Sequence, residues 1–582
     1  MAPRNLINLE SVTKTYGTRH VLDAVSLGVA VGDRIGVVGR NGGGKSTLLR
    51  LLARREQADT GRVTHTGGLR VGRLGQHDDL DPKASVRHIV VGDRPEHDWA
   101  GDPRIRDIIA HLVPQLSLDT IAGPLSGGER RRVALARLLV RDDDVLLLDE
   151  PTNHLDVEAI DWLSQHLSTS GRTVVVVTHD RWLLDTVCES TWEVADGAVH
   201  TYDGGYSTFV LARAERARLA AADESRRQNL LRKELAWLRR GPPARTSKPR
   251  FRIDAANALI ENEPPPRDRF ELARMATTRL GKSVYDVEGV SVELGGKVLL
   301  DDVTWRLGPG DRVGIVGVNG AGKTTLLRLL DQTLAPSSGR VDVGRTVAVA
   351  HLTQEVTAVD PGLRVLQAVE AVRGEVRLGS GDTMTAGQLL ERFGFAGQTQ
   401  WSRVGELSGG ERRRLQLLRL LMDEPNVLLL DEPTNDLDIE TLTVLEDVLD
   451  AWAGSLVVVS HDRWFLERVT DSIWALLGDG DLVMLPGGVD EYLDRRRSAA
   501  EQVAVVAARP KGGDARAARK ELARVEREVE KLSRREQVLH SDLAANATDH
   551  AKVLELDTLL RSVQGEREEL EARWLALADE AG

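Results

Sequence analysis

The chain has 582 residues, 41% of them hydrophobic and 29% charged, with a formal net charge of −12 and one cysteine. This length predicts three or four domains. The single cysteine excludes internal disulfides and four-cysteine metal sites, and it favours a reducing cytoplasm. The net negative charge argues against a protein that coats nucleic acid in general. No apolar run approaches the about 20 residues that a membrane-spanning helix needs, and the first residues lack the apolar stretch of a signal peptide, so no membrane partner is expected.

A glycine-rich loop follows a short predicted strand, Arg34–Val38. It fits the pattern G-x-x-x-x-G-K-[ST], in which successive backbone N–H groups converge on a phosphate at a helix N-terminus. In this pattern Lys45 neutralises the β- and γ-phosphates, and Ser46 offers its hydroxyl to Mg²⁺. The candidate phosphate-binding residues of this loop are Gly39, Asn41, Gly42, Gly44, Lys45, Ser46 and Thr47.

Two further motifs complete the chemistry of the first half. Ser126, Gly127 and Gly128 open a predicted helix, whose N–H donors and positive dipole suit an anion. Asp149 and Glu150 follow an unbroken apolar run, which is typical of a buried strand. There Asp149 would hold Mg²⁺, directly or through water, and Glu150 would orient and polarise the attacking water, because phosphoryl transfer needs mainly positioning and charge stabilisation.

Between the halves, residues 209–283 form a predicted helical linker with a strongly basic stretch. Helix-like sequence is interrupted at 241–243 by Gly-Pro-Pro. From Arg226 to Arg252 there are ten Lys or Arg and one acid, Glu234, a composition suited to phosphate backbones with salt-dependent affinity. The alternative is a solvated pair of basic helices. The candidate RNA contacts are Arg239, Arg240, Arg245, Lys248, Arg250 and Arg252.

The second half repeats the first: the glycine loop returns after 278 residues and the Asp-Glu pair after 282. A tandem duplication of this kind predicts two α/β cassettes, each a P-loop ATPase domain, at residues 1–208 and 284–497. Asp431 matches the Mg²⁺-binding aspartate, Glu432 the water-orienting glutamate, and Thr324 the hydroxyl that Mg²⁺ needs. The repeated loop and helix start add the candidates Gly317, Asn319, Gly320, Gly322, Lys323, Thr325, Ser408, Gly409 and Gly410.

Residues 498–582 end the sequence with a predicted antiparallel coiled-coil hairpin. Leucine and valine at heptad spacing form two seams, the first interrupted by Glu536 and the second by Arg567. A turn is expected at 546–549, with Thr548 as a helix cap. Two readings stay open for this segment: a hairpin that adds stability, or an element that binds the ribosome or another nucleic acid.

The sequence Leu-Ser-Gly-Gly-Glu followed by three arginines, together with the loop and the Asp-Glu pair, resembles the ATP-binding cassette (ABC) superfamily. This resemblance implies ATP and Mg²⁺ as cofactors. It also implies that the signature helix start of one cassette caps the γ-phosphate bound on the other. One site would join Lys45, Gln76, Asp149, Glu150 and His179 to Ser408 and Gly410. The other would join Lys323, Gln354, Asp431, Glu432 and His461 to Ser126 and Gly128.

Three further roles follow from the same resemblance. Gln76 and Gln354 would also contact Mg²⁺. The switch histidines His179 and His461 would contact the γ-phosphate. Tyr16 matches the aromatic side chain that stacks on adenine, whereas Leu294 stands at the equivalent position of the second half and cannot stack. The two ATP sites are therefore expected to differ in affinity or turnover.

The extended Glu-Pro-Thr-Asn runs at 150–156 and 432–438, with a helical linker between tandem cassettes, resemble the ABC-F family of ribosome-associated ATPases, most closely its Uup-like branch. The resemblance implies a cytoplasmic ATPase that is monomeric, pairs its own cassettes, and directs its linker to ribosomal RNA and the P-site tRNA near the tRNA exit site. Translation factors and antibiotic-resistance factors share this architecture. The alternatives are the ATPase subunit of a transporter and a DNA-binding or repair ATPase.

Overall fold

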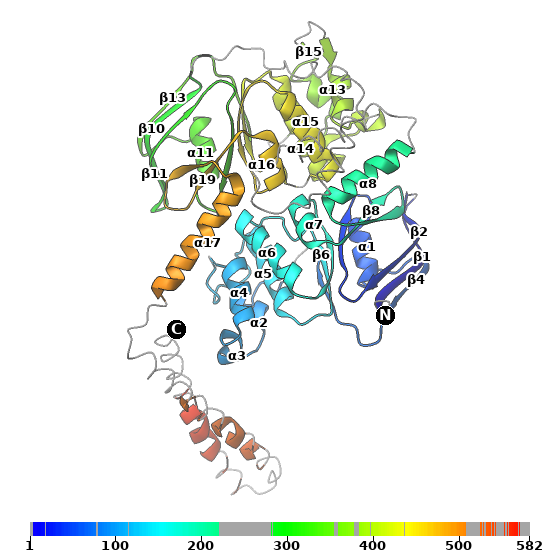
Figure 1. The fold of residues 1–582 in the computed structure, drawn as a ribbon, viewed down its shortest axis with the longest axis vertical. Helices are drawn as coiled ribbons and strands as arrows, with labels where there is room; N and C mark the ends of the chain where they lie inside the picture. The colour runs from blue at the N-terminus through cyan, green and yellow to red at the C-terminus, as the bar shows by residue number, and fades with distance from the viewer. Residues whose placement is uncertain are drawn as a thin grey trace. The chain divides into compact units, whose positions relative to one another are not determined.

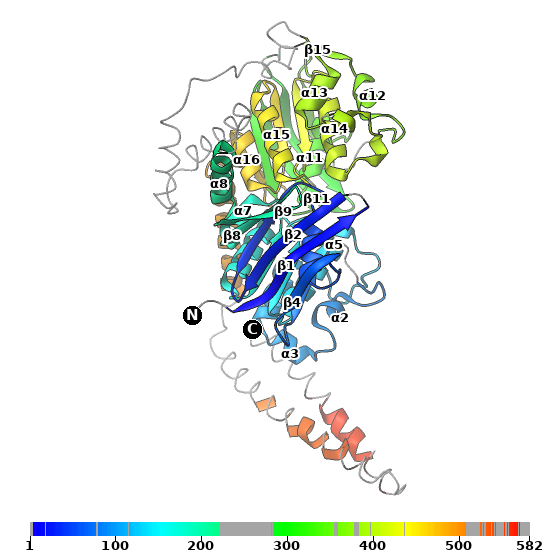
Figure 2. The ribbon, with the colours of Figure 1, turned by 90° about the vertical axis from the view of Figure 1, so that its right-hand side faces the viewer.

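The computed structural model describes residues 4–17, 19–76, 80–114, 116–219, 281, 283–353, 359–377, 383–395, 397–435 and 437–507, and short stretches between 524 and 570. The chain divides into two compact units, Met1–Tyr492 and Leu493–Gly582. Both predicted cassettes belong to the first unit (Figure 1; Figure 2). Most of the predicted linker, including Arg239, Arg240, Arg245, Lys248, Arg250 and Arg252, lies outside the described residues, as does Gln354.

The first cassette combines a three-stranded antiparallel sheet with a six-stranded sheet that is parallel except at one edge. The strand order is β2-β1-β4 in the small sheet and β5-β6-β7-β3-β8-β9 in the large one, where β9 is antiparallel to β8. The strands are β1 (Asn5–Tyr16), β2 (Arg19–Ala30), β3 (Arg34–Val38), β4 (Thr60–His65), β5 (Val71–Leu74), β6 (Val145–Asp149), β7 (Thr173–Val177), β8 (Ser190–Ala195) and β9 (Ala198–Asp203). The helices are α1 (Lys45–Leu52), α2 (Val86–Val91), α3 (Glu96–Ala100), α4 (Pro103–Leu112), α5 (Gly127–Val140), α6 (Val157–Thr169), α7 (Arg181–Val187) and α8 (Tyr206–Leu219).

Alternate residues of the central strands face opposite sides of the large sheet, which explains the unbroken apolar runs. Val145 and Leu147 of β6 pack in the cluster that contains α1 and the small sheet. Leu146 and Leu148 pack in the cluster that contains α5 and α6. Both faces of the large sheet are therefore buried, as is usual for parallel strands. Helix α1 is held in this first cluster between the two sheets.

The second cassette repeats this topology strand for strand. Its small sheet has the order β11-β10-β13 and its large sheet the order β14-β17-β18-β12-β19-β20. The strands are β10 (Tyr285–Leu294), β11 (Lys297–Leu307), β12 (Arg312–Gly317), β13 (Ser338–Val343), β14 (Val349–Leu352), β17 (Val427–Asp431), β18 (Ser455–Val459), β19 (Ser472–Leu476) and β20 (Leu482–Leu485). The helices are α11 (Lys323–Leu330), α12 (Val365–Glu370), α13 (Ala386–Arg392), α14 (Gly409–Met422), α15 (Ile439–Ala451), α16 (Arg463–Val469) and α17 (Gly488–Ala507).

These two repeats confirm the predicted pair of α/β cassettes. The second cassette also has a short hairpin, β15 (Glu375–Arg377) with β16 (Thr383–Thr385), and the 3₁₀ turns η1 (Gly397–Trp401) and η2 (Val404–Glu406). They lie between the glutamine loop and the signature, where the second half is four residues longer than the first. None of the helices in the described ranges is long and apolar enough to cross a membrane.

In the second unit, side chains from both predicted seams meet. Leu539, Leu560 and Val563 form a small buried cluster. The residues that interrupt the two seams, Glu536 and Arg567, form an ion pair with each other. These contacts support the predicted hairpin, which remains a prediction as a whole because the expected turn lies outside the described residues.

A buried charge cluster joins the two cassettes. Arg181 of α7 is 1% exposed and forms an ion pair with Glu446 of α15, which is fully buried. Its guanidinium group also lies 3.4 Å from Asp462 and packs between the rings of Tyr206 and Trp464, with 5.9 and 5.7 Å to the ring centres. A buried guanidinium of this kind is held by the carboxylates that compensate its desolvation.

We expect Arg181→Met to reduce the free energy of unfolding by about 3 kcal/mol, because it leaves a buried carboxylate short of a partner. The shift of the urea-unfolding midpoint, followed by tryptophan fluorescence, measures this loss. The double variant Arg181→Met with Glu446→Leu should recover only part of it, because Glu446 also pairs with Arg468 at 3.3 Å and Asp462 also loses Arg181. A single-variant loss below about 1 kcal/mol would contradict the expectation.

Candidate nucleotide-binding site

The two glycine loops connect β3 to α1 and β12 to α11. Gly39 has φ 142°, and a Cβ atom there would lie 2.3 Å from the carbonyl oxygen of Val194. Gly44 caps α1 with φ 109°, a left-handed conformation that glycine adopts without strain. The chain can therefore turn tightly enough to point the N–H groups at the start of α1 into the loop.

Lys45 lies inside its loop and is 6% exposed. Its Nζ donates to the carbonyl oxygens of Gly39 and Arg40, at 2.6 and 3.1 Å. Burial lowers its pKa, so a phosphate that entered the loop would meet a desolvated cation. Lys323 repeats this arrangement, with its Nζ 2.6 Å from the carbonyl oxygen of Gly317. Both predicted phosphate-binding lysines therefore already point into their loops.

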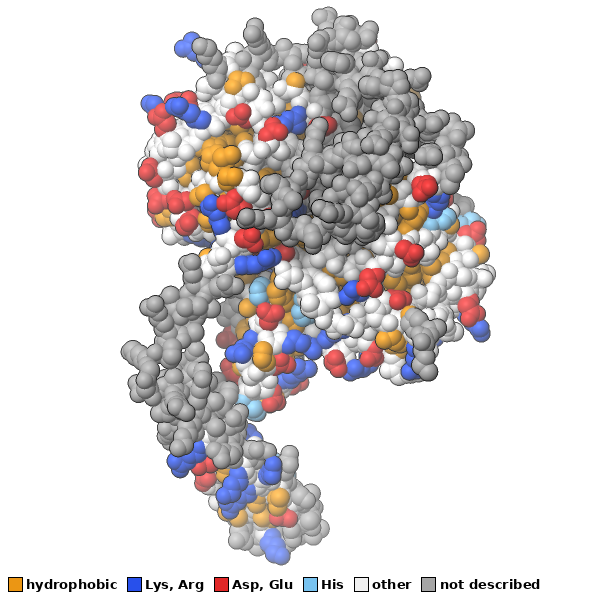
Figure 3. Space-filling model, in the orientation of Figure 1, with side chains coloured by type: hydrophobic (Ala, Val, Ile, Leu, Met, Phe, Trp, Pro, Cys, Tyr) orange, Lys and Arg blue, Asp and Glu red, His pale blue; other side chains and the backbone are white. Residues whose placement is uncertain are grey.

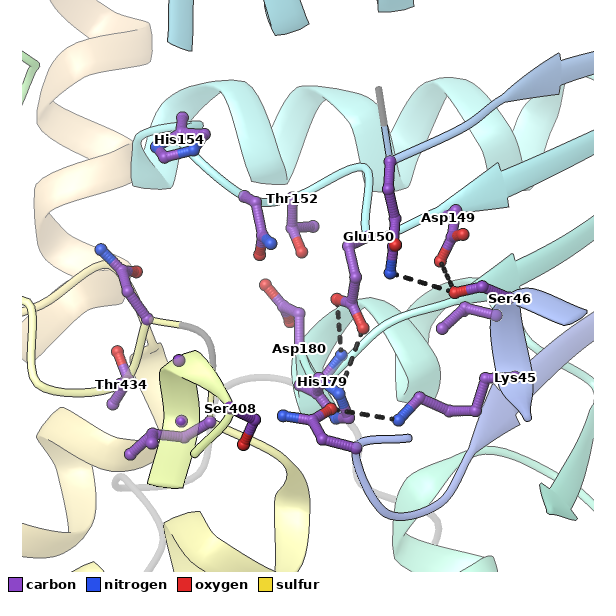
Figure 4. Close-up of a pocket in the computed structure, with 18 of the residues that line it drawn as sticks. Lys45, Ser46, Asp149, Glu150, Thr152, His154, His179, Asp180, Ser408 and Thr434 are labelled. Carbon is purple, nitrogen blue, oxygen red and sulfur yellow. Dashed lines mark hydrogen bonds and ion pairs between the residues drawn. The ribbon is translucent and has the colours of Figure 1, made fainter. Parts of the chain in front are cut away.

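A hydroxyl and a carboxylate lie side by side next to each loop. Ser46 donates to Asp149 Oδ1 at 3.2 Å and accepts from Gln76 Nε2 at 3.1 Å (Figure 4). In the second cassette Thr324 donates to Asp431 Oδ2 at 2.8 Å. The other carboxylate oxygen of each aspartate is buried and has no hydrogen-bond partner among the described residues.

This arrangement fits Mg²⁺, which prefers oxygen ligands and keeps several positions for water and phosphate oxygens. The described ranges contain no cluster of three or more His, Cys, Asp or Glu that could hold a metal ion by itself. A metal at Ser46 and Asp149 would therefore depend on the nucleotide for its remaining ligands.

The adjacent glutamate and the switch histidine lie side by side in each cassette, with side chains that are 4–15% exposed. Glu150 has φ 51° and Glu432 has φ 48°, a left-handed conformation that is uncommon outside glycine and that often marks functional positions. Glu150 Oε1 lies 3.2 Å from His179 Nε2, and the backbone N–H of His179 donates to Glu150 Oε2 at 3.3 Å (Figure 4). Glu432 and His461 repeat both distances.

Desolvation sets the charges of this pair. Burial raises the pKa of Glu150 and of Glu432 to about 8. Burial lowers the pKa of His179 to about 3 and that of His461 well below its ordinary value. Each histidine is therefore an uncharged hydrogen-bonding group at neutral pH, and each glutamate is poised to hold or release a proton.

Two arginines in the signature helices also belong to the site, and the sequence analysis missed them. Arg131 donates to the carbonyl oxygens of Gly75 and Asp149, and to that of Glu150 at 3.2 Å. Arg413 does the same in the second cassette. Each guanidinium fixes the end of the Asp-Glu strand, and the first also fixes the residue before Gln76. The sequence signal for Arg131 and Arg413 was an arginine that recurs four residues after Gly127 and after Gly409.

The signature serines have a structural role as well. Ser126 accepts from the backbone N–H of Glu129, and Ser408 from that of Glu411, each at 3.3 Å. In return each glutamate side chain accepts from the backbone N–H of its serine, which completes a capping box. The caps hold the helix starts in place, so that their glycine N–H groups face outward.

Residues from both cassettes line one large cavity of 1080 Å³. Its walls include Tyr16, the predicted phosphate and Mg²⁺ residues of the first cassette except Gly39, and Ser408, Gly409 and Gly410 of the second. Figure 4 shows Ser408 across the cavity from Glu150 and His179. A separate cavity of 370 Å³ is lined by Ser126 and Gly128 on one side and by Asn319, Gly320, Glu432 and His461 on the other. Lys323, Thr324 and Asp431 are not among the residues that line this smaller cavity.

The adenine position also differs between the halves. Tyr16 is 46% exposed, and its hydroxyl accepts from Arg50 at 3.1 Å and donates to Glu56. These bonds hold the ring beside the large cavity. Leu294 is 45% exposed and offers no ring.

Known sequences agree with this geometry. A family model described as ABC transporter matches residues 22–153 and 300–435, and a second with the same description matches 192–272. The uncharacterized ABC transporter ATP-binding protein YfmR of Bacillus subtilis (strain 168) is 36% identical over 99% of each chain. The energy-dependent translational throttle protein EttA of Escherichia coli (strain K12) is 37% identical over 82% of this chain and 93% of that protein. EttA of Mycobacterium tuberculosis (strain ATCC 25618 / H37Rv) is 36% identical over 87% and 97%.

Solved structures share the fold at lower identity. The archaeal ribosome recycling factor aABCE1, crystallised with the ribosomal stalk protein aP1, matches with a TM-score of 0.61 at 22% identity, over 83% of this chain and 92% of that chain. RNase-L Inhibitor matches with a TM-score of 0.59 at 21% identity, over 84% and 93%. At these identities the likeness concerns the two-cassette fold alone.

The raised pKa of the two glutamates predicts a pH-dependent stability. An unfolded glutamate titrates near its ordinary value of 4.5, whereas Glu150 and Glu432 titrate near 8. Their contribution to stability is therefore complete below pH 4.5 and is lost as the pH rises to about 8. We expect the ATP-free double variant Glu150→Gln with Glu432→Gln to melt a few degrees above the natural protein at about pH 8.5, and to gain much less at about pH 5.

Differential scanning fluorimetry across this pH range measures the effect. Asp142→Asn serves as the control, because that carboxylate is 76% exposed and its removal should give no pH-dependent gain. A stabilisation of the double variant that is the same at both pH values would contradict burial as the cause.

Proposed function

Since the chain belongs to the ABC-F family of ATP-binding cassette proteins, we propose that it uses ATP bound at two composite sites to act on the ribosome. The family makes the chain an ATPase that converts ATP to ADP and phosphate. The proposed domains are the cassettes 1–208 and 284–497, the linker 209–283 and the hairpin 498–582. The observation that carries the proposal is the largely buried Glu150–His179 pair, which faces a signature helix start from the other cassette.

The geometry supports a division of labour at the first site. Lys45 neutralises the β- and γ-phosphates, and the N–H groups of Gly409 and Gly410 complete the anion site from the second cassette. Glu150 orients the attacking water while His179, uncharged and hydrogen-bonded to it, fixes the position of its carboxylate. Ser46 and Asp149 would hold Mg²⁺, which when bound neutralises charge on the phosphate oxygens. At the second site Lys323, Thr324, Asp431, Glu432 and His461 take these roles with Ser126 and Gly128.

The ribosome is the proposed partner for two reasons. The EttA relatives are named as translational throttle proteins, and the basic stretch between Arg226 and Arg252 suits a phosphate backbone. On the face of the cassettes seen in Figure 3, acidic and basic side chains intermingle where the side chains are described. We propose that Arg239, Arg240, Arg245, Lys248, Arg250 and Arg252 contact ribosomal RNA and the P-site tRNA. The outcome would be modulation of translation or protection of the ribosome from antibiotics, in the cytoplasm and by a monomer.

We expect Glu150→Gln with Glu432→Gln to lower ATP hydrolysis by about 100-fold or more while ATP still binds. The ATP-bound protein should then accumulate on ribosomes, because hydrolysis would no longer release it. Sedimentation through a sucrose cushion with ATP measures the bound fraction, with Asp142→Asn as the control. Sedimentation with the free protein only, at low salt, would overturn the ribosomal role but not the ATPase assignment.

We expect Tyr16→Leu to weaken ATP binding at the first site by about fivefold or more, since stacking on one base contributes about 1–3 kcal/mol. The reciprocal change, Leu294→Tyr, should strengthen binding at the second site. Titration with a fluorescent ATP analogue resolves the two affinities. Equal affinities in the natural protein, unchanged by Tyr16→Leu, would contradict a role for Tyr16 in stacking.

A further inference from the structure

The carboxylate of Glu440 joins three elements of the first unit. Glu440 lies in the first turn of α15 in the second cassette. Its Oε2 lies 2.5 Å from Nε of Arg40, which belongs to the glycine loop of the first cassette. Its Oε1 forms an ion pair with Arg213 of α8, the last described helix before the basic linker sequence. One side chain therefore contacts an ATP loop and the start of the linker at the same time.

A second bond fixes the same loop to the same helix. Asp438 caps α15 by accepting from the backbone N–H of Thr441 at 2.9 Å. Its other oxygen, Oδ2, accepts from the backbone N–H of Asn41 at 2.9 Å. The start of α15 is thus held against the first glycine loop through a backbone contact, which defines where Glu440 lies relative to Arg40.

Helix α8 is anchored on its other side within its own cassette. Arg213 also pairs with Glu193 of β8 at 2.9 Å, and Arg216 pairs with the same carboxylate at 2.8 Å. Glu193 is 3% exposed. Burial by itself would raise the pKa of Glu440, but hydrogen bonds from Arg213 and Arg40 outweigh it and lower that pKa. Both arginines thus favour the ionised carboxylate.

The other half of the molecule is built differently at the equivalent positions. Glu158 is the counterpart of Glu440 and accepts from the hydroxyl of Tyr492 in α17 at 2.6 Å. Val318 stands where Arg40 stands in the first loop, so no ion pair to the second glycine loop is possible. The cap residue Asp156 pairs with Arg132 of its own cassette at 3.3 Å. Among the described residues, the ionic link between a glycine loop and α8 lies at the first ATP site.

We propose that Glu440 is a positioning residue that couples occupancy of the first composite ATP site to helix α8. When α15 closes on the loaded loop, Glu440 binds Arg40 and Arg213 together, and α8 is fixed against the cassette interface. When the cassettes separate, the two arginines lose their shared partner, and α8 keeps only its other contacts, such as those of Arg213 and Arg216 with Glu193 and of Ser207 with Asp185. The second site has no such link, so the two ATP molecules have different effects on the linker.

The coupling must be reciprocal, because thermodynamic linkage requires that docking of α8 favours ATP binding as much as ATP favours docking of α8. If ATP at the first site stabilises α8, then removing Arg213 should weaken ATP binding at that site. Arg213 lies in α8 and not in the glycine loop, so a purely local structural role of this arginine would leave that affinity unchanged. This inference rests on the proposed binding of ATP but not on the proposed ribosomal role.

Hydrogen exchange of the α8 amides, with and without ATP and Mg²⁺, tests the proposal on the full chain. In the natural protein we expect ATP to slow their exchange by about fivefold or more, the lower end of typical allosteric couplings. Glu440→Gln and Arg213→Met should each reduce this effect to less than about twofold. Glu158→Gln is the matched control at the equivalent position of the other half and should keep the full effect.

ATP binding is followed in the same samples with a fluorescent analogue. Absence of ATP binding by the natural protein would refute the proposed function. ATP binding without any change in the exchange of α8 would refute only the coupling through Glu440. The coupling is also overturned if Glu440→Gln keeps the full ATP-dependent slowing of α8 exchange, or if Glu158→Gln loses it. If Glu440→Gln lowers the melting temperature by more than a few degrees, Arg213→Met tests the same ion pair from the side of α8.

Discussion

Parallel strand pairing is the constraint on which both candidate sites depend. In the first cassette β3 pairs with β7 and β7 with β6, all in the same direction, so their carboxyl ends meet at one edge of the sheet. The loop before Lys45, the pair Asp149–Glu150 and His179 follow these three strands. Residues more than 100 positions apart thereby become neighbours, at the place where open α/β sheets bind ligands.

The same edge concentrates groups that are costly to bury. Lys45 and Asp149 are buried and Glu150 and His179 are largely buried, and desolvation is the main cause of the pKa shift of each. Arg131 donates hydrogen bonds to backbone oxygens at the end of β6 and so stabilises the left-handed turn at Glu150. The fold thus positions these groups, and the negative charges of a bound triphosphate would compensate the positive charge of Lys45.

Much of the fold and of the candidate sites could be predicted from the sequence, because the motifs that carry the chemistry are short and local. The glycine loops, the Asp-Glu strand ends and the duplication predicted two α/β cassettes, and the strand orders confirm them. Arg131, Arg413 and Glu440 could not be recognised in this way. Their partners are backbone oxygens or residues of the other cassette, and only tertiary packing decides which of many arginines and glutamates reaches them. The predicted RNA contacts, which lie in the linker, still depend on charge pattern alone.

The Glu536–Arg567 pair in the second unit has a consequence for how two helices align. Leucine seams repeat every seven residues, so two such helices can slide by one heptad and still bury apolar side chains. A slip here would place Glu536 and Arg567 each opposite an apolar position of the other seam and leave two charges without a partner. The polar interruptions therefore select one register, much as a buried polar residue does in a designed coiled coil. The two polar interruptions of the heptad pattern therefore favour the pairing of Glu536 with Arg567 that the structure describes.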